Sequence, residues 1–157
     1  PKCLDCPVQK HCQAFKQGID DLLPVKTKSN AQVKTKLVVA LVKNQYGEYL
    51  VNKRKDTGLL ANFYEFLSFE YEGEKEPREF LLDRLSPICE KVKNIELIGT
   101  FNHVFSHRIW EMESYNVTVK TGYSDEVAED SQLWVREDEL SNYPLVAAHQ
   151  KILKSLK

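Results

Sequence analysis

Leu37-Val38-Val39-Ala40-Leu41-Val42 is the stretch that decides the fold of this chain. A continuous apolar run rich in β-branched residues is typical of a strand that is buried on both faces. The segment Asn44-Gln45-Tyr46-Gly47 follows as a turn, and residues 49–51 form the next short apolar run. The sequence therefore predicts a hairpin at the start of a folded domain.

Strands and helices are predicted on the C-terminal side of this hairpin. Pro77 suits the first turn of a helix, and Leu81, Leu85, Ile88 and Val92 follow at helical spacing. Pro87 should kink or end that helix. Further strands are expected at residues 63–71, 95–105, 109–121 and 133–135, and a closing helix at 146–156. The fold class is therefore α+β, an α/β/α sandwich with a mixed sheet and about two helices.

Composition places the chain among ordinary globular proteins. Its 157 residues suffice for one hydrophobic core, with 42% hydrophobic and 29% charged residues. No apolar run approaches the roughly 20 residues of a membrane span, and no secretory leader is visible. Four cysteines, three of them bunched, fit a reducing compartment better than a disulfide scaffold. We expect an intracellular monomer that does not contact a membrane.

Charge is distributed unevenly along the chain. Residues 1–36 hold seven lysines and three aspartates, for a net charge of +4. Because the whole chain carries −1, the remainder carries −5. Such an acidic domain would bind nucleic acid poorly by charge alone, whereas the basic leading stretch would bind it better. Residues 13–35 show no sustained period and are predicted to be a connector.

The first twelve residues hold Cys3, Cys6 and Cys12 at the spacing of a compact metal-ligating loop. Four-iron clusters take four cysteines, and zinc would also accept three cysteines with one histidine. The alternative is a set of small buried thiols. The next cysteine, Cys89, is expected in the core. A fourth ligand is therefore expected upstream of Pro1, which would make this chain the C-terminal piece of a larger protein.

Residues 101–108, Phe-Asn-His-Val-Phe-Ser-His-Arg, form the second candidate site. They lie between two predicted strands, where a rigid sheet can present a recognition loop. Ser106 can both donate and accept a hydrogen bond, and Phe105 can stack on or wedge beside a base. The alternative is a strand connection whose polar residues only face water.

Taken together, these motifs resemble the C-terminal part of the MutY family of adenine DNA glycosylases. The resemblance rests on Cys-x2-Cys-x5-Cys, the basic connector, the Gly58–Phe66 segment and the Phe105-Ser106-His107 triplet, in this order. Tyr64 and Leu67 depart from the family pattern of Trp and Pro and are interpreted as packing changes.

The resemblance implies three regions and a function in base excision repair. Residues 1–12 would be the end of a 4Fe-4S cluster loop, with Cys3, Cys6 and Cys12 as three of its four ligands. Residues 13–35 would connect it to a Nudix (MutT)-like domain at 36–157. That domain would recognise 8-oxoguanine in double-stranded DNA containing an 8-oxoguanine:adenine pair, with Ser106 on the oxidised base and Phe105 and His107 beside it. An upstream helical domain would remove the adenine.

Two consequences concern what this piece lacks. The catalytic residues of the glycosylase would lie in the helical domain, so none is expected here, and the cluster would be incomplete or absent. The Nudix signature G-x5-E-x7-R-E-U-x-E-E-x-G-U, in which U is a bulky apolar residue, has its closest match at residues 78–85. Leu82 stands there in place of a metal-binding glutamate, and a leucine cannot bind Mg²⁺.

Two alternative functions stay open at this point. One is a Nudix-type nucleoside triphosphate pyrophosphohydrolase, and the other is a zinc-stabilised interaction domain.

Overall fold

The computed structural model describes residues 2–25, 32–73, 75–89, 91–120 and 131–156. The chain divides into two compact units, Pro1–Ala31 and Gln32–Lys157. The first unit consists of one-turn helices: η1 (Cys3–Asp5), η2 (Gln9–His11), α1 (Gln13–Lys16) and η3 (Asp20–Leu22). Among the described residues, no helix combines the length and the apolar character that crossing a membrane requires.

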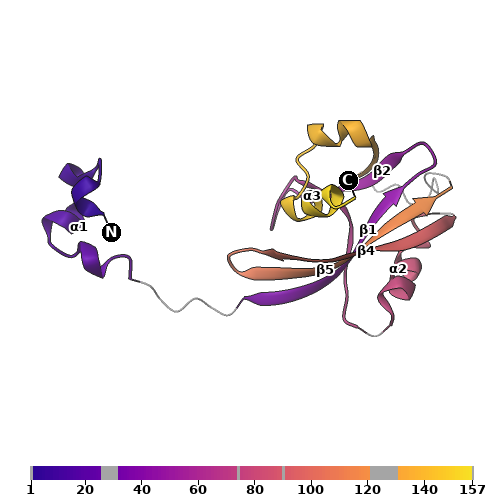
Figure 1. Cartoon of the computed structure of the whole chain (residues 1–157), viewed down its shortest axis with the longest axis horizontal. Coiled ribbons are helices and arrows are strands. Elements are labelled where there is room, and N and C mark those ends of the chain that lie inside the picture. The colour runs from indigo at the N-terminus through magenta and orange to yellow at the C-terminus, as the bar shows by residue number, and fades with distance from the viewer. Residues whose placement is uncertain (1, 26–31, 74, 90, 121–130, 157) are drawn as a thin grey trace. The chain divides into compact units, whose positions relative to one another are not determined.

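The second unit is built on one mixed sheet of six strands (Figure 1). The order across the sheet is β4-β5-β1-β3-β2-β6. β1 and β5 run parallel, whereas the other neighbouring pairs are antiparallel. The strands are β1 (Val33–Lys43), β2 (Glu48–Lys53), β3 (Tyr64–Glu70), β4 (Val92–Val104), β5 (Arg108–Val119) and β6 (Gln132–Arg136).

β1 is central in the sheet and is buried on both faces, as its unbroken apolar run predicts. Leu37, Val39 and Leu41 belong to one buried cluster, which also contains residues of α3 (Ala147–Lys154) and Leu140 of η4 (Glu137–Asn142). The residues between them pack into a second cluster with α2 (Pro77–Leu85). The two helices therefore cover opposite faces of the sheet (Figure 1). The predicted α/β/α sandwich is confirmed.

The predicted hairpin of β1 and β2 is correct only at its turn. The Asn44 N–H donates to the Glu48 carbonyl at 2.9 Å, but the two strands pair at only one position, Lys43 with Tyr49. β3 lies between them and pairs antiparallel with both. Its Phe66 and Leu67 are buried, one in each cluster. Insertion of β3 therefore buries apolar side chains on both faces, which a two-stranded hairpin cannot do.

Two predicted boundaries also shift. α2 ends at Leu85, and Val92, expected on its apolar stripe, instead begins β4. Pro87 lacks the backbone N–H that α2 would need in order to continue beyond Leu85. The first strand of the domain also starts earlier than predicted. β1 begins at Val33 rather than Lys36, because residues 33–36 pair with the start of β5. Cys89 is buried, as expected for a core thiol, and burial raises its pKa to about 11.

Leu41→Ala tests the central position of β1. Leu41 is fully buried, so its truncation should lower the free energy of unfolding by about 2–5 kcal/mol. Leu97→Ala is the matched control, because Leu97 lies on β4 and is 60% exposed. It should change stability by less than about 0.5 kcal/mol. Urea unfolding monitored by circular dichroism measures both values, and equal values would contradict the burial of β1.

Candidate functional site

The turn that joins β4 to β5 is held by hydrogen bonds to three of its backbone carbonyls. The Phe105 N–H donates to the Arg108 carbonyl at 2.7 Å, which closes a two-residue hairpin loop. Gln32 Nε2 donates to the Phe105 carbonyl at 2.8 Å, and the Val33 N–H donates to the His107 carbonyl at 3.1 Å. The start of β1 therefore holds the 105–108 turn in place.

The side chains of the three predicted residues, Phe105, Ser106 and His107, differ in their surroundings. Phe105 is half-buried and packs edge-on between two rings, with centroids 4.6 Å from His103 and 4.9 Å from Trp110. Ser106 and His107 are exposed. The three residues predicted from the sequence thus lie together at one tip of the sheet. They share a surface hollow of about 340 Å³ with Leu59 and Arg108.

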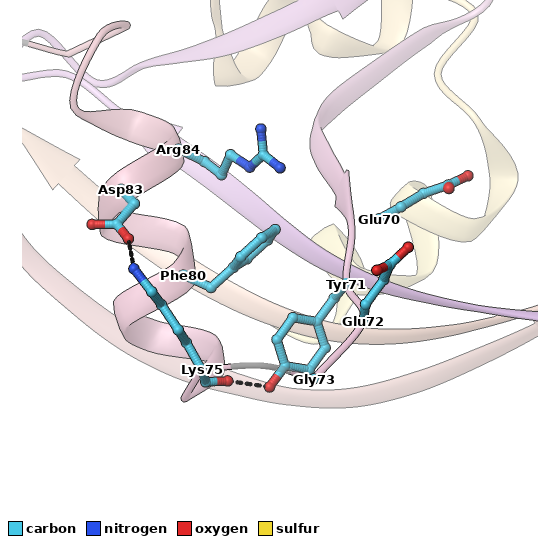
Figure 2. Close-up of a pocket in the computed structure, with 8 residues that line it drawn as sticks. All are labelled: Glu70, Tyr71, Glu72, Gly73, Lys75, Phe80, Asp83 and Arg84. Atoms are coloured by element: carbon cyan, nitrogen blue, oxygen red, sulfur yellow. Dashed lines mark hydrogen bonds and ion pairs between the residues drawn. The ribbon is translucent and has the colours of Figure 1, made fainter.

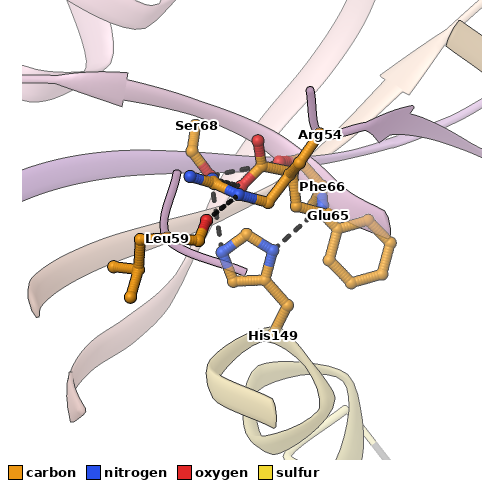
Figure 3. A network of polar contacts seen from close by, with 6 residues as sticks. All are labelled: Arg54, Leu59, Glu65, Phe66, Ser68 and His149. Carbon is orange, nitrogen blue, oxygen red and sulfur yellow. Dashed lines mark hydrogen bonds and ion pairs between the residues drawn. The ribbon is translucent and has the colours of Figure 1, made fainter. Parts of the chain in front are cut away.

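Arg54 connects the loop that contains Leu59 to Glu65 of β3 (Figure 3). Its Nη1 pairs with the Glu65 carboxylate, and its Nε donates to the Leu59 carbonyl at 3.0 Å. The guanidinium also lies 5.9 Å from the ring centre of Trp110. Burial raises the pKa of Glu65, and the charge of Arg54 offsets part of that shift.

Sequence reasoning missed this network. Arg54 lies in the basic run Lys53-Arg54-Lys55, and such runs usually face water, whereas only 25% of the Arg54 side chain is exposed. The sequence feature that could have revealed the ion pair is Glu65, which stands between two aromatic residues in a predicted strand. A carboxylate at such a half-buried position needs a cation beside it.

His149 fixes α3 to β3 from inside the core. It is fully buried, and its Nδ1 accepts a hydrogen bond from the Phe66 N–H at 3.0 Å. Nε2 therefore carries the proton of the neutral ring, and it lies 3.4 Å from Ser68 Oγ (Figure 3). Burial lowers the pKa of His149 to about 3, and the charges of Arg54 and His103 act in the same direction.

Comparison with known proteins assigns this architecture. Residues 38–155, well over half of the chain, match the NUDIX domain family. The chain belongs to the NUDIX domain family.

Several solved structures share the fold across most of the chain. The C-terminal domain of mouse MUTYH, in a complex with human PCNA, has a TM-score of 0.65 at 21% identity, covering 78% of this chain and 86% of that one. The MutT NUDIX hydrolase from Burkholderia pseudomallei has 0.64 at 14% identity, covering 80% and 100%. A NUDIX hydrolase from Nitrosomonas europaea has 0.63 at 11% identity, covering 78% and 88%. At these identities the likeness establishes the fold.

The NUDIX helix α2 offers a poor site for a metal ion. Leu82, at the position of a metal-binding glutamate in the signature, is half-buried against the core, and Leu85, at the position of its glycine, is fully buried. Neither side chain carries an oxygen that could bind a metal ion. A hollow of about 590 Å³ adjoins this helix (Figure 2). There Asp83 pairs with Lys75 at 2.6 Å, and Arg84 lies over the Phe80 ring, 5.1 Å from its centre. Within the described residues, no group of three or more His, Cys, Asp or Glu is arranged to hold a metal ion.

The three N-terminal cysteines lie in one short segment, and all are half-buried. A hydrogen bond with Asp20 raises the pKa of Cys3, and the nearby Cys12 adds a smaller effect. In the described part of the chain these thiols do not form a ligand group, and they number three where a four-iron cluster takes four. The ligand assignment of Cys3, Cys6 and Cys12 therefore stays a prediction.

His149→Gln tests the buried neutral imidazole. Because the folded pKa lies below the unfolded value of about 6.5, unfolding takes up a proton between these two pH values. The contribution of His149 to stability is fully present above pH 6.5 and should fall by about 1.4 kcal/mol per pH unit below it. Urea unfolding at pH 7.0, 6.0 and 5.0 measures this slope.

The variant should be less stable at pH 7.0, and its stability should fall less steeply as the pH is lowered. The difference between the two slopes should approach one proton. Parallel slopes for the wild type and the variant would contradict a neutral, buried His149.

Proposed function

We propose that this chain recognises 8-oxoguanine opposite adenine in double-stranded DNA, as the C-terminal domain of an adenine DNA glycosylase. The observation that carries the proposal is the exposed Ser106 hydroxyl on a turn that is fixed by the backbone. The motif resemblance along the sequence supports the same assignment.

The chemistry of a hydroxyl suits this discrimination. Guanine presents acceptors at N7 and O6 along its major-groove edge. In 8-oxoguanine, N7 carries a hydrogen and C8 carries a carbonyl oxygen. Ser106 Oγ can accept from N7–H or donate to O8, because a hydroxyl does both. With guanine, Ser106 could only donate to N7, so the hydroxyl has one possible contact where 8-oxoguanine offers two.

Rigidity of the turn supports the same role. Phe105 is held between His103 and Trp110. The Phe105 and His107 carbonyls accept hydrogen bonds from the Gln32 side chain and the Val33 N–H. Little conformational freedom remains to be lost when DNA binds, which favours affinity and register. The exposed Arg108, Lys53 and Lys55 stand near the turn and its neighbouring loop and could contact phosphates, which position a protein but do not specify sequence.

Base removal would belong to another part of a parent enzyme. We place the adenine-excising residues in an upstream helical domain and the remaining cluster ligand in the same parent. Cys3, Cys6 and Cys12 would then complete a 4Fe-4S site together with that ligand. Such a protein would act inside the cell, where the DNA is.

Ser106→Ala provides the direct test. Chemical shifts of ¹⁵N-labelled protein at millimolar concentration detect even weak binding to short duplexes containing 8-oxoguanine:adenine or guanine:adenine. The wild type should prefer the lesion duplex, with shifts at residues 104–109. The variant should lose preference roughly fivefold to tenfold, because one hydrogen bond contributes about 1 kcal/mol net.

Ser86→Ala is the matched control for this measurement, because Ser86 is an exposed serine at the end of α2. It should leave the preference unchanged. No shift with either duplex, or equal shifts with both, would count against the proposal.

Hydrolysis of nucleoside triphosphates is the second candidate, and membership of the NUDIX family favours it. Because Leu82 in α2 stands where a metal-binding glutamate is needed, we expect no Mg²⁺-dependent release of pyrophosphate or phosphate from 8-oxo-dGTP or dGTP. An ion-chromatography assay with excess Mg²⁺ measures this. Turnover above that of a protein-free control would support a hydrolase and contradict the assignment of α2 as a packing helix.

A further inference from the structure

Leu59 is an exposed apolar side chain that no part of the proposed contact to 8-oxoguanine has used. It is 42% exposed, and it lines the hollow that also contains Phe105 and Ser106. It also borders a smaller cavity of about 150 Å³ beside Arg54 and Trp110. Leu59 and Phe105 are therefore the two apolar side chains of the hollow that holds the Ser106 hydroxyl.

The loop that carries Leu59 is closed by its own backbone and by Arg54. The Arg54 N–H donates to the Phe63 carbonyl at 2.9 Å, and the Asn62 N–H donates to the Lys55 carbonyl at 3.1 Å. Leu60 and Asn62 adopt left-handed backbone conformations with φ of 56° and 62°. The Arg54 side chain adds a bond from Nε to the Leu59 carbonyl. The tip of the loop is thus held at the residue that faces the hollow.

The hollow has the chemistry of a nucleotide site. Its walls are the apolar side chains of Leu59 and Phe105, which suit the flat faces of a base. Its polar groups come from Ser106, His107 and Arg108, of which the Ser106 hydroxyl suits a base edge and the Arg108 guanidinium suits a phosphate. At about 340 Å³, it lies within the size range of ligand pockets.

We propose that Leu59 packs as an apolar wedge against the face of the base that Ser106 recognises, where that base is partly unstacked from its neighbour. Arg54 is the positioning residue that holds Leu59 there. The inference rests on the proposed function and adds a second contact, from a different loop, to the same base. Two groups on separate loops fix the base in register, so that the hydroxyl meets its N7 and C8 edge.

An arginine is required at position 54 for a geometric reason. The Arg54 guanidinium bonds the Glu65 carboxylate through Nη1 and the Leu59 carbonyl through Nε at the same time. A lysine keeps the charge and can still pair with Glu65, but its single ammonium cannot reproduce the planar fork. Arg54→Lys should therefore release the loop without leaving Glu65 unpaired.

Affinities for the 8-oxoguanine:adenine and guanine:adenine duplexes, measured from ¹⁵N shift titrations, test the contact. Leu59→Ala should reduce affinity for the lesion duplex on the order of tenfold, with a smaller loss for the guanine duplex, because only the lesion base is seated. Leu97→Ala is the matched control for the loss of an exposed leucine. It should leave both affinities unchanged.

Arg54→Lys tests the positioning role with two measurements. Amide hydrogen exchange at residues 59–63 should become faster than in the wild type, while exchange in β1 should stay the same. Lesion preference should fall in the same direction as for Leu59→Ala, and adding Arg54→Lys to Leu59→Ala should cause no further loss. Arg136→Lys is the control, because the ion pairs of Arg136 with Asp138 and Glu139 are exposed.

The outcomes separate this inference from the proposed function. Preference that is lost with Ser106→Ala but kept with Leu59→Ala would overturn the role of Leu59 and leave the proposed function standing. Additive losses from Arg54→Lys and Leu59→Ala, or unchanged exchange at 59–63, would overturn the positioning role. A wild type without any lesion preference would overturn both proposals.

Discussion

The parallel pairing of β1 with β5 is the constraint on which the rest of the domain depends. It runs without interruption from Val33 opposite Arg108 to Lys43 opposite Thr118. Its inner half provides a strand with both faces buried, and α2 and α3 pack on those faces. Its outer half extends past the helices and holds the 105–108 turn through the Val33 N–H. One ladder therefore stabilises the core and positions the candidate site.

The fold contains two candidate sites, one beside α2 and one at the 105–108 turn. They differ in which side chains they offer to a ligand. Around α2, leucines fill positions that the NUDIX signature reserves for a ligand and a glycine, and Asp83 is paired with Lys75. At the 105–108 turn and the loop beside it, Phe105 packs between two rings, Arg54 bonds Glu65 and the Leu59 carbonyl, and the Ser106 side chain is exposed. The balance favours a recognition module over a hydrolase. The His149 and Arg54 contacts support that module from within the core.

The sequence predicted the elements whose signals are local. The apolar run of β1, the alternation in β5, and Pro77 at the start of α2 each identify an element from a few neighbouring residues. The insertion of β3 between β1 and β2 was not predictable in this way, because strand order depends on contacts between distant segments. For the same reason Phe105, Ser106 and His107 were found from one contiguous motif, whereas Arg54, Leu59 and His149, from two other segments, were not.

The central claim is that the Ser106 hydroxyl meets the oxidised edge of the base, and a crystal structure of the chain bound to a duplex containing 8-oxoguanine:adenine tests it most directly. The account predicts Ser106 Oγ within about 2.6–3.2 Å of N7 or O8 of the lesion, with Leu59 and Phe105 against the base. A lesion base located at the hollow beside α2, or DNA bound with the 105–108 turn facing solvent, would contradict it.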